Sequence, residues 1–226
     1  MPIVTPSSPE HQLDQKPRYR SRQEMELRAL VETWGRAKWP EARVVHELVM
    51  GRGTVRADVV FVSPTHFATV EIKSDFDDTS RLITQAAMFR LASPELWLVN
   101  PQRHARDAAL VRYLLPSLGL AEPDPPIAKG VIDPLARLTE TAAAAQFEPD
   151  ARAELSLLWV SELTWEAKAM GLTIKGSWTH DKLIKALSDV SVQQRRAMTC
   201  RQLRARQALW RADPAIPLLG AGPAPS

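Results

Sequence analysis

Residues 46–73 read HELVMGRGTVRADVVFVSPTHFATVEIK, and this stretch decides the fold. Apolar, β-branched segments alternate in it with two turn sequences, GRGT at 51–54 and SPTH at 63–66. Clusters of Gly, Pro and Ser between such segments are typical of hairpin turns. The pattern therefore predicts three consecutive antiparallel strands, at residues 43–50, 55–62 and 67–73.

The two turns also predict how the strands pair. If each turn closes symmetrically at its centre, Glu47 faces Asp58 and Asp58 faces Glu71. Facing side chains lie roughly 5 Å apart on the same side of a sheet, so the three carboxylates are expected in one row. Lys73 joins them because residues two apart share a face. A bulge in either hairpin would move a carboxylate to the other face.

Three acids in one row need a compensating charge, since like charges opposite one another destabilise a sheet. A divalent cation with oxygen ligands, Mg²⁺ or Mn²⁺, is the simplest candidate. The sequence therefore predicts a metal site on this face of the sheet.

The spacing of these acids resembles a known nuclease motif. Arg56-Ala57-Asp58, twelve residues and then Glu71-Ile72-Lys73 resemble the core of the PD-(D/E)XK nuclease superfamily. The run from Glu71 through Asp78, Arg81-Leu82 and Gln85 to Leu96-Trp97-Leu98-Val99 is similar to a branch of bacterial and phage nuclease-like proteins. The resemblance covers roughly residues 24 to 211. It implies an α/β fold, with a restriction-endonuclease-like mixed sheet core flanked by helices.

The chain departs from the superfamily pattern at two positions. Ala57 precedes Asp58 where the motif begins with Pro, a change that leaves the metal ligand in place. Phe89 lies four residues after Gln85, where related nucleases often have Tyr, so a hydroxyl contact to DNA is absent.

The resemblance implies hydrolysis of phosphodiester bonds by a metal-activated water. Cations held by carboxylates neutralise the scissile phosphate and stabilise the leaving oxygen. Asp58 and Glu71 would be direct ligands, helped by the backbone carbonyl of Ile72. Glu47 would complete the shell directly or through water. Lys73 would hold the phosphate or orient the attacking water.

Residues outside the hairpins are also expected at this site. Ser21 is predicted to cap a helix that runs to about Lys38. In many members of the superfamily, an acidic residue of the first helix joins the metal site. Glu26 is the best positional match, although a surface glutamate would also suit the first turn of a helix. Arg56 is expected to contact DNA.

A second helix is predicted after the third strand, capped by Asp77 or Asp78 and running to about Leu91. Arg81 and Gln85 share one of its faces because they are four residues apart. In a right-handed crossover this helix covers one side of the sheet, so both side chains would hold a phosphate or a metal-bound water. The alternative is that Arg81 and Gln85 are polar surface side chains without a binding role.

The first domain is predicted to comprise residues 21–150. After the second helix, its sequence pattern predicts fewer regular elements. Residues 96–99 form a short apolar strand, and a helix is expected at about 105–115. The Pro-rich segment 122–126 is not expected to form a regular element, whereas 129–132 is a candidate edge strand.

Residues 151–212 are predicted to be a small helical unit. Residues 161–172 and 182–187, joined through Lys175-Gly176, are similar to a SAP-type helix, extended loop and helix, which binds the DNA backbone. Lys175, Lys182 and Lys185 are the matching basic positions, and a last helix is expected at 193–210. Many helical hairpins without a nucleic-acid role share this pattern.

Charge is unevenly distributed along the 226 residues. The net charge is +3, yet the segment 168–211 has two acids, Asp181 and Asp189, against ten basic residues. These are Lys168, Lys175, Lys182, Lys185, Arg195, Arg196, Arg201, Arg204, Arg206 and Arg211. This segment is suited to a polyanion, or it is a solvated helical face.

Composition narrows the class of protein further. With 45% hydrophobic and 24% charged residues, the chain is ordinary for a globular domain. The single Cys200 excludes an internal disulfide framework. No apolar run is long enough to span a bilayer, and the N-terminus lacks a signal-peptide core, which predicts a cytoplasmic protein without a membrane partner. Residues 1–20 and 213–226 are expected to be disordered tails.

Two functions follow from the sequence. The first is a Mg²⁺-dependent DNA endonuclease in repair, recombination or a phage context, as a monomer or as the homodimer that several relatives form. The second is a DNA-binding or regulatory protein that uses a nuclease fold for docking. A third alternative is an RNA substrate. The spacing Glu-x-Lys alone is uninformative, because Glu166-Ala167-Lys168 has it inside a helical pattern.

Overall fold

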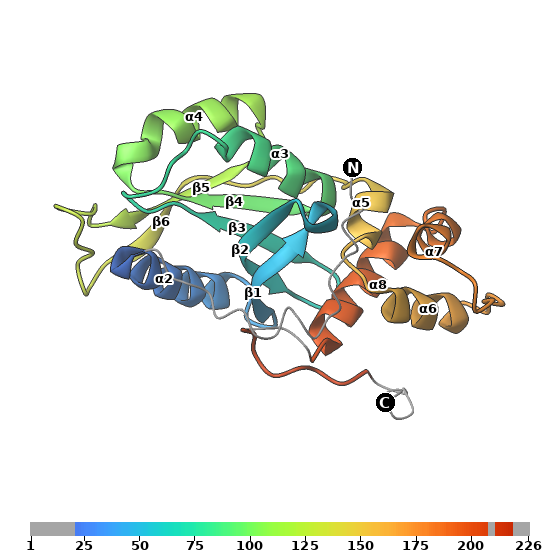
Figure 1. Ribbon diagram of the computed structural model, residues 1–226. Coiled ribbons are helices and arrows are strands. Elements are labelled where there is room, and N and C mark those ends of the chain that lie inside the picture. The colour runs from blue at the N-terminus through green and yellow to red at the C-terminus, as the bar shows by residue number, and fades with distance from the viewer. Residues whose placement is uncertain (1–20, 208–210, 219–226) are drawn as a thin grey trace.

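Six strands form one mixed sheet in the chain described by the computed structural model, residues 21–207 and 211–218 (Figure 1). The strands lie in chain order, with β3, β4 and β5 parallel and the other neighbours antiparallel. Their bounds are β1 (Arg43–Met50), β2 (Val55–Val62), β3 (Phe67–Ile72), β4 (Glu95–Val99), β5 (Gly119–Asp124) and β6 (Arg137–Ala142). The predicted α/β class, a mixed sheet flanked by helices, is confirmed.

Helices cover both faces of this sheet (Figure 1). One face packs against α2, which contributes Leu27 and Val31 to the core, and the other packs against α3 and α4. The helices are α2 (Arg22–Lys38), α3 (Leu82–Ala92), α4 (Ala105–Leu114), α5 (Ala151–Leu155), α6 (Val160–Ala169), α7 (His180–Leu187) and α8 (Val192–Ala205). Among residues 21–207 and 211–218, no helix is long and apolar enough to cross a membrane.

The predicted pairing of the first three strands is confirmed. His46 pairs with Val59 in the first hairpin, and Val59 pairs with Val70 in the second. Continuing each ladder by one residue places Asp58 opposite both Glu47 and Glu71. The two turn sequences therefore predicted the register of this part of the sheet.

The expected straight row of acids is interrupted at Glu47. This residue has a φ of 56°, in the left-handed region that non-glycine residues rarely adopt. Val45 and Leu48 consequently pack into the same core, although residues three apart in a regular strand point to opposite faces. The first strand thus bends at Glu47 and turns its carboxylate towards α2.

The predicted start of α2 is confirmed, whereas the predicted start of α3 is wrong. Ser21 caps α2 by accepting a hydrogen bond from the backbone N–H of Glu24, as expected. The second helix, α3, begins at Leu82 instead of Asp77 or Asp78. Asp77 accepts hydrogen bonds from Ser74, and Asp78 accepts them from Ser80, so both carboxylates stabilise the preceding turns.

The region after α4 corrects the sequence analysis. The Pro-rich segment 122–126 begins inside β5, and β6 pairs with it, whereas 129–132 is a turn closed by an isolated bridge between Ala128 and Val131. Pro123 is tolerated because the ladder with β4 ends at Ala121, so its missing N–H faces no parallel neighbour.

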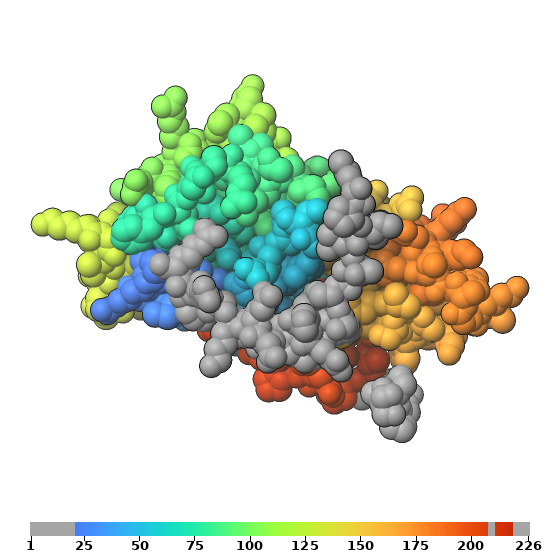
Figure 2. Space-filling model, in the orientation of Figure 1, coloured from blue at the N-terminus to red at the C-terminus, as the bar shows by residue number. Residues whose placement is uncertain are grey.

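The helical unit at residues 151–205 has its own small core and also joins the main one. Leu155, Leu163, Ile184 and Met198 pack together within it, while Cys200 packs against the sheet. Figure 2 shows the unit, in orange, at one end of the molecule. The last helix ends at Ala205, and the remainder of its predicted range reaches residues 208–210, which lie outside the described residues.

The predicted tail after residue 212 begins with an ordered segment. Ala212 forms a bridge with Val45, and Asp213 accepts a hydrogen bond from the N–H of Val44 at 2.9 Å. Asp213 also pairs with Arg36 at 2.7 Å, so the segment covers the edge of β1. Within the predicted tail 213–226, Asp213 and Ile216 thus contact the folded chain, the latter through a hydrogen bond to the carbonyl of Arg204 at 2.8 Å, and residues 1–20 and 219–226 lie outside the described residues.

Candidate metal and phosphate site

An open pocket of about 390 Å³ lies where α2, the first three strands and α3 meet. Of the residues predicted for the metal and phosphate site, all except Glu26 line it. The predicted residues that line the pocket are Glu47, Arg56, Asp58, Glu71, Ile72, Lys73, Arg81 and Gln85. Residues from four separate elements therefore converge on one cavity.

Asp58 lies at the centre of the pocket, on β2. Its Oδ2 accepts a hydrogen bond from the backbone N–H of Ile72 at 2.7 Å, which ties β2 to the end of β3. Its Oδ1 accepts one from Nη2 of Arg28 at 3.2 Å. Burial raises the pKa of Asp58, and the charge of Arg28 opposes this change.

Glu71 has a strongly raised pKa. Burial first, and then the charge of Asp58, raise its pKa to about 8. Its Oε1 accepts a hydrogen bond from Nζ of Lys73 at 2.7 Å. Its Oε2 is buried and has no hydrogen-bond partner within the described residues. Two neighbouring carboxyl groups at the base of this pocket thus share the positive charge of Arg28 and Lys73.

Lys73 connects the acids to α3. Besides Glu71, its ammonium group donates a hydrogen bond to Oε1 of Gln85 at 3.1 Å. Its own backbone N–H continues the parallel pairing by donating to the carbonyl of Val99 at 2.9 Å. The side chain is therefore fixed at both ends, and Gln85 reaches it from the first turns of α3, as the helical spacing predicted.

Arg28 is the residue that the sequence analysis missed. Its side chain is 2% exposed, and it donates hydrogen bonds to Glu47 at 2.9 Å and to both the carboxylate and the carbonyl of Asp58. Although burial lowers the pKa of Arg28, the charges of Asp58, Glu47 and Glu24 raise it above its ordinary value. The available signal was its position four residues after Glu24, on the helix face that also carries Val31.

The acid of α2 that lies at the pocket is Glu24, whereas Glu26 is outside it. Glu24 lines the cavity and contacts Arg28. Glu26 forms an ion pair with the exposed Arg22 on another side of the helix. Residues two apart on a helix point in nearly opposite directions, and the burial of Leu27 and Val31 fixes which side faces the sheet.

The mouth of the pocket carries exposed positive charge. Arg56 is 57% exposed and contacts Oε2 of Glu47 at 2.7 Å. Arg81 is exposed at the start of α3. Position 89, where related nucleases have Tyr, is a core position, because Phe89 is 1% exposed beneath α3.

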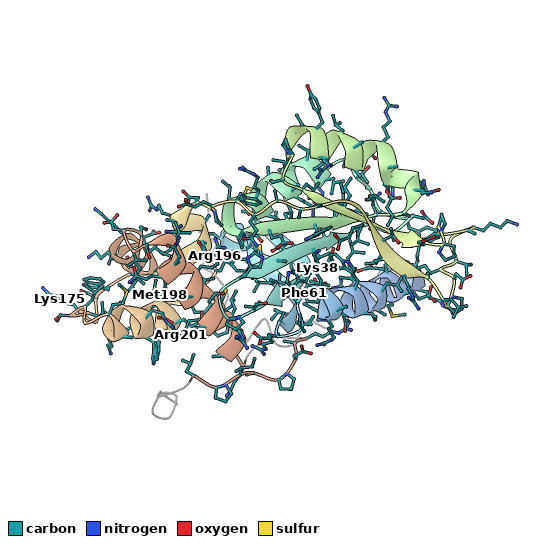
Figure 3. The ribbon with its side chains drawn as sticks, turned by 180° about the vertical axis from the view of Figure 1, so that it is seen from behind. Lys38, Phe61, Lys175, Arg196, Met198 and Arg201 are labelled. Atoms are coloured by element: carbon teal, nitrogen blue, oxygen red, sulfur yellow. The ribbon has the colours of Figure 1, made fainter. Side chains whose placement is uncertain are left out.

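The basic surface of the helical unit is smaller than its composition suggests. Arg195 and Arg196 both pair with Glu154, Arg201 pairs with Glu166, and Arg206 pairs with Glu162. Lys175, Lys182 and Lys185 remain exposed, outside the pocket. Figure 3 shows Arg196 on the side of α8 towards the sheet and Lys175 at the far end of the unit.

Three carboxylates do not form a preassembled metal centre here. Among residues 21–207 and 211–218, no group of three or more His, Cys, Asp or Glu side chains is arranged to hold a metal ion. The bend at Glu47 explains this, because it directs that carboxylate to Arg28 and Arg56. Asp58 and Glu71, with the carbonyl of Ile72, are the remaining candidate ligands.

A family model described as bacteriophage P4 protein cII matches residues 18–213. The chain belongs to this family. The matched range includes the whole sheet and the helical unit, so the family comprises both parts of the structure. No curated protein and no solved structure matches the chain.

Proposed function

We propose that this chain is a metal-dependent nuclease that hydrolyses phosphodiester bonds of DNA. The observation that carries the proposal is the convergence of Asp58, Glu71 and Lys73 in one open pocket, with exposed arginines at its mouth. Convergence of an acid pair and a lysine is the arrangement that the resemblance to PD-(D/E)XK nucleases implies. The proposed cofactor is Mg²⁺ or Mn²⁺.

The residues present fit a divalent cation. Mg²⁺ is usually held by one or two carboxylates, keeps several waters and shares the phosphate of its substrate as a ligand. Asp58 and Glu71 supply two carboxylates, and the buried Oε2 of Glu71 has a free lone pair. Burial raises the pKa of both acids, and the charge of Asp58 adds to the rise at Glu71, so a bound cation would favour the ionised form of both. When bound, the cation would lower the pKa of a water molecule and polarise the phosphate.

The surrounding side chains have separate tasks in this proposal. Lys73 presents a positive charge beside Glu71, where it would neutralise charge that develops on the phosphate. Gln85 fixes the position of the ammonium group. Arg28 holds the carboxylate of Asp58 in place through Oδ1, while Ile72 holds it through Oδ2.

The proposed DNA-binding surface extends from the pocket to the helical unit. Arg56 and Arg81 lie at the mouth of the pocket. Arg52, in the turn between β1 and β2, pairs with Asp181, which is the neighbour of Lys182 on α7. A polyanion that leaves the pocket along this hairpin would therefore meet Lys182 and then Lys185.

Cleavage assays test the proposal directly. Single-stranded, nicked, branched and linear duplex DNA would be incubated with Mg²⁺ or Mn²⁺ and with the wild type, Asp58→Asn or Lys73→Ala. Loss of charge at either position should reduce the rate at least about 100-fold. Lys168→Ala is the matched control. Glu166-Ala167-Lys168 repeats the motif spacing on α6, outside the pocket, and Lys168 is exposed, so this change should leave the rate unchanged. Equal cleavage by the wild type and Asp58→Asn would identify a contaminating nuclease and refute the proposal.

A second candidate is a DNA-binding or regulatory protein without cleavage. Arg28 favours it, because this buried guanidinium already offsets the charges of Glu47 and Asp58 without a metal. Titration calorimetry separates the two candidates. Tight DNA binding without detectable Mg²⁺ or Mn²⁺ binding would support the second candidate, whereas metal binding that is lost in Asp58→Asn would support the first.

We further propose a cytoplasmic location, where the substrate lies, and a role in DNA repair, recombination or a phage context. The phage name of the family supports the last of these. Light scattering in solution tests the homodimer that the resemblance implies.

A further inference from the structure

An aromatic ring lies exposed beside the proposed catalytic pocket. Phe76 is 70% exposed, in the loop that connects β3 to α3. The next two residues of the chain, Asp77 and Asp78, line the pocket, and Lys73 precedes the ring by three residues. Phe76 does not line the pocket itself, but its Cα lies only about 3.8 Å from that of Asp77, which does.

The loop that carries this ring is rigidly held. Gln23 of α2 accepts a hydrogen bond from the N–H of Asp75 at 2.7 Å and donates one to its carboxylate at 2.8 Å. Arg103 donates a hydrogen bond to the carbonyl of Asp75 at 2.6 Å. Exposure of Phe76 is therefore a property of a fixed loop.

The residue on the other side of the ring is fixed as well. Asp77 accepts hydrogen bonds from the N–H and the hydroxyl of Ser74 at 2.6 and 2.8 Å. His104 contacts the carbonyl of Ser74 at 2.9 Å. The backbone is thus anchored both before and after Phe76.

Two exposed cations lie on segments that meet this loop. Arg103 is exposed and donates a hydrogen bond to the residue before Phe76. The β5–β6 connection makes a tight turn in which Lys129 and Gly130 both have positive φ, at 51° and 75°. A Cβ on Gly130 would lie 3.5 Å from Cζ of Phe76, in ordinary contact with the ring. The turn therefore holds the exposed Lys129 near the ring without covering it.

We propose that Phe76 is a stacking platform for an unpaired base of a single-stranded nucleic acid, with Arg103 and Lys129 beside the adjoining phosphates. Aromatic side chains flanked by positive charge bind single strands in this way, because every base has a face that stacks on a ring. Within a duplex those faces are already covered by neighbouring bases. The inference rests on the proposed function and adds that the substrate has an unpaired segment next to the cleavage site.

Single exposed aromatic residues are common on protein surfaces. Tyr113, on α4, is 82% exposed and provides the comparison. Tyr113 lies on a helix that contributes no residue to the pocket lining, whereas Phe76 lies in an anchored loop and directly precedes Asp77 and Asp78, which do line the pocket. Tyr113→Ala is consequently the matched control for Phe76→Ala.

Binding without metal tests the inference. Fluorescence anisotropy would compare a labelled oligothymidine with a blunt duplex of equal length, in EDTA. Phe76→Ala should weaken single-strand binding about 5- to 150-fold and leave duplex binding within about twofold. Phe76→Trp should restore single-strand affinity, and Tyr113→Ala should change neither. Thermal melting would establish that each variant is folded.

Equal weakening on both substrates, or no change with the single strand, would overturn the inference. The same comparison in an Asp58→Asn background keeps it separate from the proposed nuclease activity. If the wild type does not cleave DNA but Phe76→Ala still loses single-strand affinity, the nuclease proposal fails and the stacking platform remains. If the wild type cleaves while Phe76→Ala binds normally, the stacking platform fails alone.

Discussion

The molecule contains two groups of buried acids with opposite electrostatic surroundings. In the helical unit, Glu154 is fully buried and lies against Arg195 and Arg196, at 2.9 and 2.5 Å. In the pocket, Asp58 and Glu71 lie beside each other, and burial raises the pKa of both. One group of acids is matched by arginines, and the other exceeds the positive charge around it.

This difference distinguishes a structural network from a site. Each acid of the helical unit joins two elements: Glu154 connects α5 to α8, and Glu166 connects α6 to α8. The pocket also has buried cations, Arg28 and Lys73, yet four carboxylates approach them. An excess of buried negative charge is expected where a cation binds. The comparison therefore predicts that removing an acid has opposite effects on stability in the two places.

The largest effect is expected from Glu154→Gln. Loss of this charge leaves Arg195 and Arg196 buried without their common partner, which should lower the free energy of unfolding by about 3 to 5 kcal/mol. Urea denaturation followed by circular dichroism measures it. Glu148→Gln is the control, because Glu148 is 65% exposed and 3.5 Å from Arg195, and it should change stability by less than about 1 kcal/mol. Equal effects of the two variants would remove the contrast between the two groups of acids.

The second largest effect is expected from metal binding, which should increase the free energy of unfolding of the protein. At a concentration of Mg²⁺ or Mn²⁺ one hundred times its Kd, the folded state gains about 2.7 kcal/mol. For a chain of this size the melting temperature should then rise by about 5 to 10 °C, measured by scanning calorimetry. Asp58→Asn should abolish the rise, and Glu26→Gln, which lies outside the pocket, should retain it. A rise that persists in Asp58→Asn would locate the metal elsewhere.

Glu71 should make the metal-free protein less stable as pH increases. Its pKa is about 8 in the folded protein and 4.5 as the ordinary value, so between these pH values the folded state binds more protons than the unfolded chain. Stability therefore falls as pH rises from about 4.5 to about 8. In Glu71→Gln, the free energy of unfolding should lack the decrease with pH that Glu71 causes. Above pH 8, this variant should be more stable than the wild type by about 1 to 2 kcal/mol. Denaturation in EDTA at several pH values tests it, and parallel curves for both proteins would contradict it.

The smallest effect on stability is expected from the exposed lysines of α7. Replacing Lys182 and Lys185 with Ala should change the free energy of unfolding by less than about 0.5 kcal/mol. DNA affinity should nevertheless become less dependent on salt, with the slope of log K against log salt reduced by about one for each phosphate that a lysine no longer neutralises. Arg201→Ala is the opposite control, since its pairing with Glu166 serves stability, and it should leave the salt slope unchanged. An unchanged slope in the lysine variant would remove α7 from the proposed DNA surface.

Local sequence was sufficient to predict the register of the two hairpins, and with it the meeting of Asp58 and Glu71. The turns after Met50 and Val62 are short, so the register of each pair follows from the position of the turn. The helical spacing of Arg81 and Gln85 likewise placed both at the pocket. Glu26 was misplaced because an acid-rich first turn has several candidates, and only the packing of Leu27 and Val31 selects the face of α2 that meets the sheet.

Interactions between distant segments could not be predicted in this way. Arg43, at the start of β1, donates hydrogen bonds to the carbonyl groups of Leu203, Arg204 and Arg206 at 2.7 to 3.0 Å. In sequence, the arginines of α8 and Arg206 suited either a polyanion-binding surface or a solvated helical face. Arg195, Arg201 and Arg206 instead pair with acids at least 35 positions away in the chain. A charge count does not reveal such partners.

By itself, the sequence determined the hairpin register, the α/β class and the meeting of Asp58 with Glu71, because turns and strand alternation act over a few residues. The tertiary structure alone decided that Arg28 enters the acidic cluster, that Glu47 turns towards it and that the helical arginines are paired. These features depend on the packing of α2 and α8 against the sheet. Burial then fixes which charges lie together, and that arrangement involves residues far apart in the chain.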